Sequence, residues 1–271
     1  MGFIRAFGKW FKPLLKPVYR VYENWLWTQV VNGPKPKHVA IIPDGNRRWA
    51  RLQGLNPLYG HEVGYEKVKE VLNWLWELGV KIATIYGMSY ENCTRRSEEE
   101  RNHLMNLLRR SLDEFGNDDY LSKYRVRVKF VGRLELIPPD ILSKIAEVEE
   151  RSSKYDEHFL NIALCYGGRQ EIVDAVVKLV KDVLEGNVRV EDVNEDLFRR
   201  YLSTSHLSIN GFEEPDLVIR TSGELRISNF LLWQIAYSEL YFCDVYWPEF
   251  RRIDLLRAVR SYQKRERRFG R

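Results

Sequence analysis

The sequence predicts a single α/β domain with a mainly parallel central sheet flanked by helices. Strand-like and helix-like runs alternate along the chain, which is typical of that class. With 271 residues, 44% of them hydrophobic, the chain can bury one large core. Several strand-like runs also end at polar residues, as in open α/β sheets, where ligands bind beyond the carboxyl ends of the strands.

The predicted elements follow from these runs. Apolar and β-branched stretches predict strands at 38–43, 81–86, 126–131, 160–165, 216–219 and 239–242. Apolar residues at helical spacing predict helices at 62–78, 97–115, 139–151, 170–185 and 194–202. Residues 38–256 would form the domain, with a basic amphipathic segment and linker at 1–37 and a basic tail at 257–271.

The charge is unevenly distributed. The chain carries a net +5, yet residues 1–37 and 257–271 each carry +6, which leaves −7 for the domain between them. A uniformly basic surface for nucleic acid is therefore not expected.

The N-terminal segment is predicted to be an amphipathic helix. Its apolar face would hold Phe3, Ile4, Phe7, Phe11, Leu14, Leu15, Val18 and Tyr22, and its basic face Arg5, Lys9, Lys12, Lys16 and Arg20. This pattern favours a helix lying on an anionic membrane surface, with packing on the body or on a partner as the alternative. The basic residues interrupt any apolar core of a secretory signal, and no apolar run reaches the roughly 20 residues of a membrane span.

The three cysteines, Cys93, Cys165 and Cys243, are widely spaced and form no metal-binding pair. We interpret them as reduced thiols, which predicts a cytoplasmic protein. The N-terminal helix would make it peripheral on the inner face of a membrane.

The stretch HVAIIPDGNRR at residues 38–48 is the strongest candidate site. Asp44 ends an apolar run and offers a hard oxygen ligand suited to Mg²⁺. Gly45 lets the backbone approach a ligand closely, and Arg47 and Arg48 offer forked donors that match phosphate oxygens. A helix is expected from about Arg48. The alternative is that Asp44 only caps that helix.

Polar clusters also follow three other strands. The second strand leads to Ser89, Glu91, Asn92 and Arg95, and the fourth leads to the Tyr-Gly-Gly-Arg of residues 166–169, which could also be a simple turn. After the fifth strand, Arg220, Arg226 and Ser228 predict a second anion site, distinct from the first. Glu239 begins the last strand, where a buried carboxylate needs a cation, although an ordinary ion pair is the alternative.

Common phosphate-binding signatures are absent. The chain has no GxxxxGK[ST] loop, no GxGxxG fingerprint and no His/Cys zinc constellation.

Six stretches resemble the ordered motifs of the cis-prenyltransferases, which include undecaprenyl and dehydrodolichyl diphosphate synthases. They are HVAIIPDGNRRWA, GHEVGYEKV, SYENCTR, NIALCYGGRQEI, PDLVIRTSGELRISNFLLWQIAYSELYF and RERRFG. The resemblance covers residues 38–271, and the Asn-Arg-Arg after Asp44-Gly45 is similar to archaeal and eukaryotic members.

The resemblance implies repeated cis-condensation of isopentenyl diphosphate onto an allylic diphosphate, with a hydrophobic prenyl tunnel, Mg²⁺ and a homodimer. Asp44 and Asn92 would be catalytic, Asn92 at the proton-abstraction step, and Asp44 and Glu239 would bind the metal. Substrates would be held by Gly45, Asn46, Arg47, Arg48, Trp49, His61, Ser89, Tyr90, Glu91, Arg95, Arg220, Arg226, Ile227 and Ser228. The Arg-x-Gly at residues 268–270 would reach toward a dimer partner's diphosphate site; the alternative is a solvated tail.

Two positions depart from the bacterial pattern. Cys93 stands where those enzymes usually have Trp, and Pro57 where an arginine near the allylic diphosphate is common; Arg47 is a candidate to replace that cation. Gly87 leaves room for a bulky starter.

The sequence thus predicts a long-chain, undecaprenyl-like product, the precursor of a glycosyl carrier lipid. Geranylgeranyl diphosphate is the favoured starter and farnesyl diphosphate the second choice. The rival interpretations are a non-catalytic scaffold subunit of a heteromeric enzyme and a lipid-surface binding module.

Overall fold

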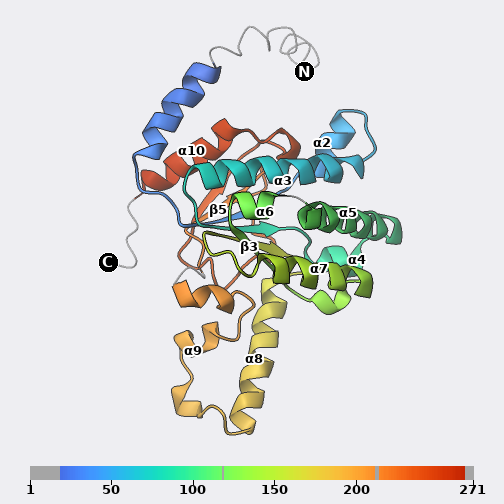
Figure 1. Cartoon of the computed structure of the whole chain (residues 1–271), viewed down its shortest axis with the longest axis vertical. Coiled ribbons are helices and arrows are strands. Elements are labelled where there is room, and N and C mark those ends of the chain that lie inside the picture. The colour runs from blue at the N-terminus through green and yellow to red at the C-terminus, as the bar shows by residue number, and fades with distance from the viewer. Residues whose placement is uncertain (1–18, 118, 211–213, 266–271) are drawn as a thin grey trace.

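The centre of the molecule is one parallel sheet. The computed structural model describes residues 19–117, 119–210 and 214–265, and within them the sheet has six strands in the order β3-β4-β2-β1-β5-β6 (Figure 1). The strands are β1 (His38–Ile42), β2 (Ile82–Tyr86), β3 (Val126–Val131), β4 (His158–Ala163), β5 (Leu217–Arg220) and β6 (Glu239–Phe242). Every predicted strand is confirmed within two residues.

Helices connect these strands. They are α2 (Asn46–Leu52), α3 (Tyr59–Glu77), α4 (Tyr90–Arg95), α5 (Glu98–Asn117), α6 (Tyr120–Lys123), α7 (Pro139–Ser152), α8 (Gly168–Leu184), α9 (Glu195–Arg199) and α10 (Arg252–Gln263). The five predicted helices are present, and α2 begins two residues before Arg48. The prediction missed α4, α6 and α10, and the predicted basic tail at 257–271 begins inside α10.

Both faces of the sheet are covered, so the central strands are buried and mostly apolar; the polar exceptions in β1 and β2 are His38 and Thr84, which hydrogen-bond each other. All five residues of β1 and all five of β2 are buried. Register pairs Val39 of β1 with Ala83 of β2 and with Leu217 of β5. Such buried parallel strands appear in a sequence as continuous apolar runs, which is why they were predictable.

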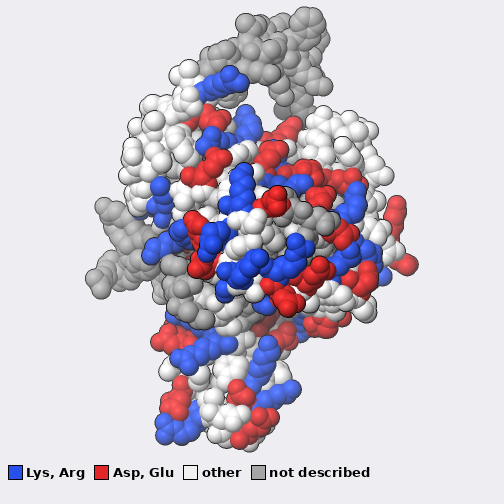
Figure 2. Space-filling model, in the orientation of Figure 1, with Lys and Arg blue, Asp and Glu red and all other residues white. Residues whose placement is uncertain are grey.

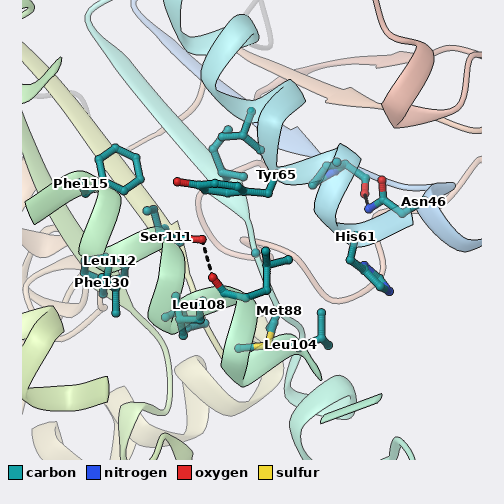
Figure 3. Close-up of a pocket in the computed structure, with 18 of the residues that line it drawn as sticks. Asn46, His61, Tyr65, Met88, Leu104, Leu108, Ser111, Leu112, Phe115 and Phe130 are labelled. Carbon is teal, nitrogen blue, oxygen red and sulfur yellow. Dashed lines mark hydrogen bonds between the residues drawn. The ribbon is translucent and has the colours of Figure 1, made fainter. Parts of the chain in front are cut away.

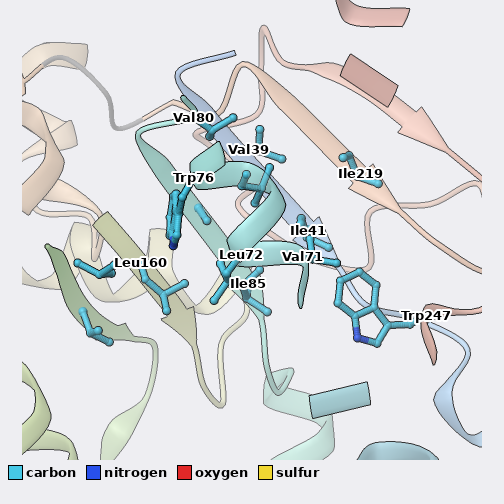
Figure 4. Packing of buried hydrophobic residues seen from close by; sticks show 14 of the residues in the cluster. Val39, Ile41, Val71, Leu72, Trp76, Val80, Ile85, Leu160, Ile219 and Trp247 are labelled. Carbon is cyan, nitrogen blue, oxygen red and sulfur yellow. The ribbon is translucent and has the colours of Figure 1, made fainter. Parts of the chain in front are cut away.

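The larger core lies between the sheet and α3. Figure 4 shows Val39 and Ile41 of β1 close to Val71 and Leu72 of α3, with Trp247 at one side. Leu72 and Trp247 are fully buried. Truncating Leu72 to alanine would cost about 2–5 kcal/mol of stability, because transfer and cavity terms add. This packing fixes α3 against one face of the central strands.

A helix over residues 19–31 packs along α10 (Figure 1). Leu26 and Val30 are fully buried, and Arg252 and Arg260 of α10 lie 4.3 and 4.6 Å from the ring centres of Trp27 and Trp25. For this part, the alternative of packing on the body holds. The remainder of the predicted amphipathic helix, residues 3–18, lies outside the described residues.

Across the described ranges, every helix is too short or too polar to cross a bilayer.

Candidate active site

The turn after β1 keeps the Asp44 side chain from capping the helix that follows. Gly45 adopts φ +103° and is the N-cap of α2, which has no side-chain cap. A Cβ at Gly45 would lie 2.6 Å from Cδ1 of Tyr246, so only glycine fits. The backbone N–H of Asp44 donates to Oγ1 of Thr221 at 2.9 Å, which joins this turn to the one after β5. The alternative that Asp44 only caps a helix is wrong.

The Asp44 carboxylate is paired with two arginines. Its Oδ2 lies 2.7 Å from Nη2 of Arg220, and its Oδ1 lies 3.3 Å from Nη2 of Arg48. Burial raises the pKa of Asp44, but the hydrogen bond and charge of Arg220, with the charge of Arg48, outweigh burial and lower the pKa below its ordinary value. Asp44 is therefore a carboxylate at neutral pH.

Arg220 links the two predicted anion sites. Its Nη1 donates to Oγ of Ser228 at 2.6 Å and to the carbonyl of Arg226, while its Nη2 holds Asp44. The loop that brings Ser228 here is strained, since Ser222, Ser228 and Asn229 all have positive φ. The two predicted anion sites therefore adjoin each other in the lining of one cavity.

Glu224 holds two further arginines at the cavity. Its carboxylate lies 2.9 Å from Nη1 of Arg48 and 2.6 Å from Nη1 of Arg226. Arg48 also donates to Oγ of Ser222 at 2.6 Å. These contacts fix both guanidinium groups before any ligand binds, which lowers the entropy lost on binding an anion.

A third wall comes from α4 and the start of α5. Oδ1 of Asn92 accepts from Nε of Arg96 at 2.9 Å, and Glu100 accepts from both Arg96 and Arg47. His61 on α3 has Nε2 3.6 Å from Glu100. Burial, and then the charge of Arg96, lower the pKa of His61 to about 4, so its imidazole is neutral at physiological pH.

These walls enclose a polar cavity of about 600 Å³. The predicted residues that line it are Asp44, Gly45, Asn46, Arg47, Arg48, His61, Ser89, Asn92, Arg220, Arg226 and Ser228. Within the described residues, Oδ1 of Asn46, Nε2 of His61 and Nε of Arg220 are buried without a hydrogen-bond partner. Each such group costs about 1–3 kcal/mol unless a ligand satisfies it, so the cavity is suited to a polar ligand.

An apolar cavity of about 150 Å³ adjoins the polar one. Figure 3 shows Asn46 and His61 at one end of it and Phe115 and Phe130 at the other. The residues common to both linings are Pro43, Asn46, His61, Gly87 and Leu104. The polar pocket thus opens into a hydrophobic one, as the predicted prenyl tunnel requires, and Gly87 lies at their junction.

Some predicted residues do not line the polar cavity: Trp49, Tyr90, Glu91, Arg95, Ile227 and Glu239. Arg95 is exposed on α4, whereas its neighbour Arg96 lines the cavity. The prediction missed Arg51, Arg96, Glu100 and Glu224. Spacing along the chain offered no usable signal, because Arg96 caps α4 with extended backbone and Glu100 belongs to the next helix, α5.

Glu239 is separated from Asp44 within the chain. It starts β6 and pairs in register with Leu217, at the amino end of β5, whereas Asp44 follows the carboxyl end of β1. Its carboxylate forms an ion pair with Arg265. The prediction of Glu239 as a metal ligand beside Asp44 is therefore not supported by this arrangement, and the alternative of an ion pair is the one observed.

The cysteine prediction is wrong for two of the three residues. Cys93 on α4 and Cys165 after β4 form a disulfide, and Cys243 is free. The two partners are 72 residues apart, and the parallel pairing of β2 with β4 brings their segments together. The prediction of a cytoplasmic location therefore loses the support that it took from reduced thiols. Intracellular disulfides do occur in proteins of hyperthermophiles.

Known proteins are similar to this chain in sequence and fold. A family model described as putative undecaprenyl diphosphate synthase matches residues 42–270. A tritrans,polycis-undecaprenyl-diphosphate synthase (geranylgeranyl-diphosphate specific) from Pyrococcus furiosus is 52% identical over 94% of this chain and 95% of its own. Its counterpart from Sulfurisphaera tokodaii is 48% identical over 96% of this chain and 97% of its own.

Solved structures of prenyl diphosphate synthases are similar to this chain in fold. The lavandulyl diphosphate synthase of Lavandula x intermedia, in complex with dimethylallyl diphosphate, superimposes with a TM-score of 0.82 at 34% identity, covering 88% of this chain and 99% of its own. A probable undecaprenyl diphosphate synthase from Campylobacter jejuni gives 0.70 at 28% identity, covering 88% of this chain and 100% of its own. With these matches and a cavity that joins arginines and a carboxylate to an apolar pocket, the chain belongs to the undecaprenyl diphosphate synthase family of prenyltransferases.

Proposed function

We propose that this protein condenses isopentenyl diphosphate repeatedly onto an allylic diphosphate, with cis geometry, to make undecaprenyl diphosphate. Geranylgeranyl diphosphate is the proposed starter, since relatives at about 50% identity are named as specific for it. The proposed product would be the precursor of a glycosyl carrier lipid.

One observation carries the proposal: a buried Arg220 holds Asp44 at 2.7 Å in a polar cavity that opens into an apolar one. Diphosphates need fixed cations, and a growing prenyl chain needs an apolar channel. The two adjoining cavities supply both within one site.

The residues divide between the two substrates. Arg47, Arg48 and Arg96 would bind the allylic diphosphate, while Arg220, Arg226 and Ser228 would bind isopentenyl diphosphate. As the allylic C–O bond ionises, negative charge grows on the departing diphosphate, and cations already fixed by Glu100 and Glu224 stabilise it without reorganising. A new C–C bond then forms, and the isopentenyl unit loses a proton.

Asn92 would act at that proton loss by positioning. Its Oδ1 already accepts from Arg96, and an amide oxygen is a weak base. The departing diphosphate is a stronger base in the same cavity. We therefore assign Asn92 to orienting the reacting groups, with the diphosphate as the proton acceptor.

The donor set fits Mg²⁺. Mg²⁺ commonly takes one or two carboxylates with substrate phosphates and waters, and Asp44 is an ionised carboxylate facing the cavity. Asn46 Oδ1 is a further unpartnered oxygen in the lining. When bound, the ion would neutralise charge on the departing diphosphate. Within the described ranges no cluster of three or more His, Cys, Asp or Glu residues forms, so Asp44 would be the principal protein ligand.

The proposed function is tested by product analysis. Purified protein is incubated with labelled isopentenyl diphosphate, Mg²⁺ and detergent, with geranylgeranyl or farnesyl diphosphate offered separately. Long cis-prenyl products with faster turnover of geranylgeranyl diphosphate are expected. Absence of product from folded protein with either starter would favour the scaffold-subunit interpretation, against which the assembled Asp44, Asn92 and Arg220 argue.

A homodimer is proposed through α8. This helix projects from the body beside α9 (Figure 1). It exposes an apolar stripe at helical spacing: Val173, Val176, Val177, Val180 and Leu184. Such a stripe on a water-soluble helix is suited to a second copy of itself. A Val177→Asp change is expected to shift the mass measured by light scattering from dimer to monomer, whereas Lys178→Asp is the matched control.

Peripheral attachment to the cytoplasmic face of a membrane is proposed through the N-terminal segment. Lys/Arg and Asp/Glu alternate over the visible face of the body, which supplies no single basic surface (Figure 2). Because Leu26 and Val30 are core residues, deleting residues 1–30 would damage the fold. Deleting residues 1–18 alone is expected to lower sedimentation with anionic vesicles and to leave turnover on soluble substrates unchanged. Unchanged sedimentation would contradict the assignment.

A further inference from the structure

The disulfide joins a helix of the active site to the sheet. Cys93 lies in the middle of α4, and Cys165 follows β4 with φ +46°. Both are buried, with 7% and 0% of their surface exposed, and their Cα atoms lie 5.5 Å apart. Neither lines the polar cavity, so the bond acts on the site only through the helix it holds.

Backbone hydrogen bonds join the start of α4 to this part of the sheet. The Tyr90 N–H donates to the Tyr166 carbonyl at 2.7 Å, and the Tyr166 N–H donates to Met88 at 3.1 Å. These bonds fix the entry to α4. Cys93 lies one turn farther on, and the exposed Arg95 follows it. A helix of six residues is marginal without tertiary contacts, so the disulfide fixes its second half.

That second half sets two cavity residues. Asn92 precedes Cys93, and its side chain holds Arg96, which has only 19% of its side chain exposed. Arg96 also pairs with Glu100 at the start of α5. A displacement of α4 would therefore move Asn92 and Arg96 together. Arg220 and Ser228, on the opposite wall, are held from β5 and its loop and would stay in place.

We propose that the Cys93–Cys165 disulfide positions Asn92 and Arg96 for the allylic diphosphate, and that its reduction weakens this half of the site selectively. The inference rests on the proposed function. Reduction by a dithiol breaks the S–S bond and transfers two electrons and two protons. Cys93 and Cys165 become thiols, and the two thiols of the reductant become its own disulfide.

The test compares four samples of the full chain: wild type purified without reductant, wild type treated with dithiothreitol, the Cys93→Ser/Cys165→Ser double variant, and Cys243→Ser as the control. Peptide mapping by mass spectrometry is expected to find Cys93 joined to Cys165 in the first and last samples. Free thiols at both positions in untreated wild type would overturn the inference.

Kinetics separate positioning from a loss of stability. In the treated and double-variant samples, the KM for the allylic diphosphate is expected to rise about fivefold or more and kcat to fall about tenfold, with the KM for isopentenyl diphosphate unchanged. A purely structural bond would lower the active fraction, and with it kcat, while leaving both KM values unchanged. That result would overturn the inference.

If oxidised wild type makes no product, the proposed function fails. The positioning role is then judged by calorimetric binding of inorganic pyrophosphate. Binding that weakens about fivefold on reduction supports the role, and unchanged binding overturns it.

Discussion

Arg220 and Asp44 hold the ends of two strands together at the centre of the site. Nη2 of Arg220, the last residue of β5, lies 2.7 Å from Oδ2 of Asp44, two residues after β1. The Arg220 side chain is 5% exposed and that of Asp44 28% exposed, so the carboxylate faces the cavity while its cation lies behind it. The pair keeps Asp44 ionised, and Nη1 of Arg220 donates to Oγ of Ser228 on the same wall.

Arg96, rather than Arg95, is predicted to bind the allylic substrate. Arg96 lines the cavity between Asn92 and Glu100, whereas Arg95 is exposed. Arg96→Met is expected to raise the KM for the allylic diphosphate about tenfold or more, since a charge-assisted hydrogen bond contributes about 1.5–3 kcal/mol. The matched control is Arg95→Met, expected to remain near wild type in steady-state assays. A larger rise in this KM for Arg95→Met than for Arg96→Met would contradict the geometry around α4.

His61 is predicted to make stability fall in acid. Burial, with the charge of Arg96, lowers its pKa in the folded protein to about 4, while an unfolded histidine titrates near 6.5. Between those values the unfolded state binds more protons, so the free energy of unfolding decreases as pH falls from about 6.5 to about 4.

Between about pH 6.5 and about pH 4, His61→Asn is therefore expected to lose less free energy of unfolding than wild type, by an amount on the order of 1–3 kcal/mol. Urea unfolding at several pH values measures the slope. The pKa values of His158 and His206 are also lowered by burial, but both residues are present in both proteins and cancel in the comparison. Identical slopes in the two proteins would refute the buried, neutral His61.

The disulfide is predicted to stabilise the fold as well as the site. Cys93 and Cys165 are separated by 72 residues, and cross-linking a long loop restricts the unfolded chain. Cys93→Ser/Cys165→Ser is expected to lower the free energy of unfolding by about 2–4 kcal/mol under oxidising conditions. Cys243→Ser, at a half-buried free thiol, provides the control. Equal denaturation midpoints for the double variant and the control would contradict this prediction.

The sheet was predictable because its strands are buried on both faces. β1 and β2 appear as mostly apolar runs, Asp44 follows such a run by two residues and Arg220 ends another. Parallel strands carry their carboxyl ends to one edge, so these residues could be grouped without a structure. The same reasoning does not place Glu239 at this edge, because Glu239 begins a strand instead of ending one.

Other features depend on tertiary packing. Ile253, Leu255, Leu256 and Val259 of α10 are buried, but the surrounding arginines made this segment resemble a solvated tail. The Cys93–Cys165 pair needs β2 and β4 to be neighbours, which spacing in the sequence does not reveal. Glu224 pairs with Arg48 because the loop after β5 folds back toward α2, and the sequence does not reveal this contact. Arg96 was overlooked because its neighbour Arg95 occupies the motif position.

The active-site assignment is tested most directly by the turnover of Asp44→Asn with labelled isopentenyl diphosphate, geranylgeranyl diphosphate and Mg²⁺. This change keeps the shape of the side chain and removes the charge that Arg220 and Mg²⁺ require. A loss of at least about 10²-fold in kcat is expected, with circular dichroism and the unfolding midpoint showing a folded protein. A folded Asp44→Asn protein that retains wild-type kcat would contradict the assignment of this cavity as the active site.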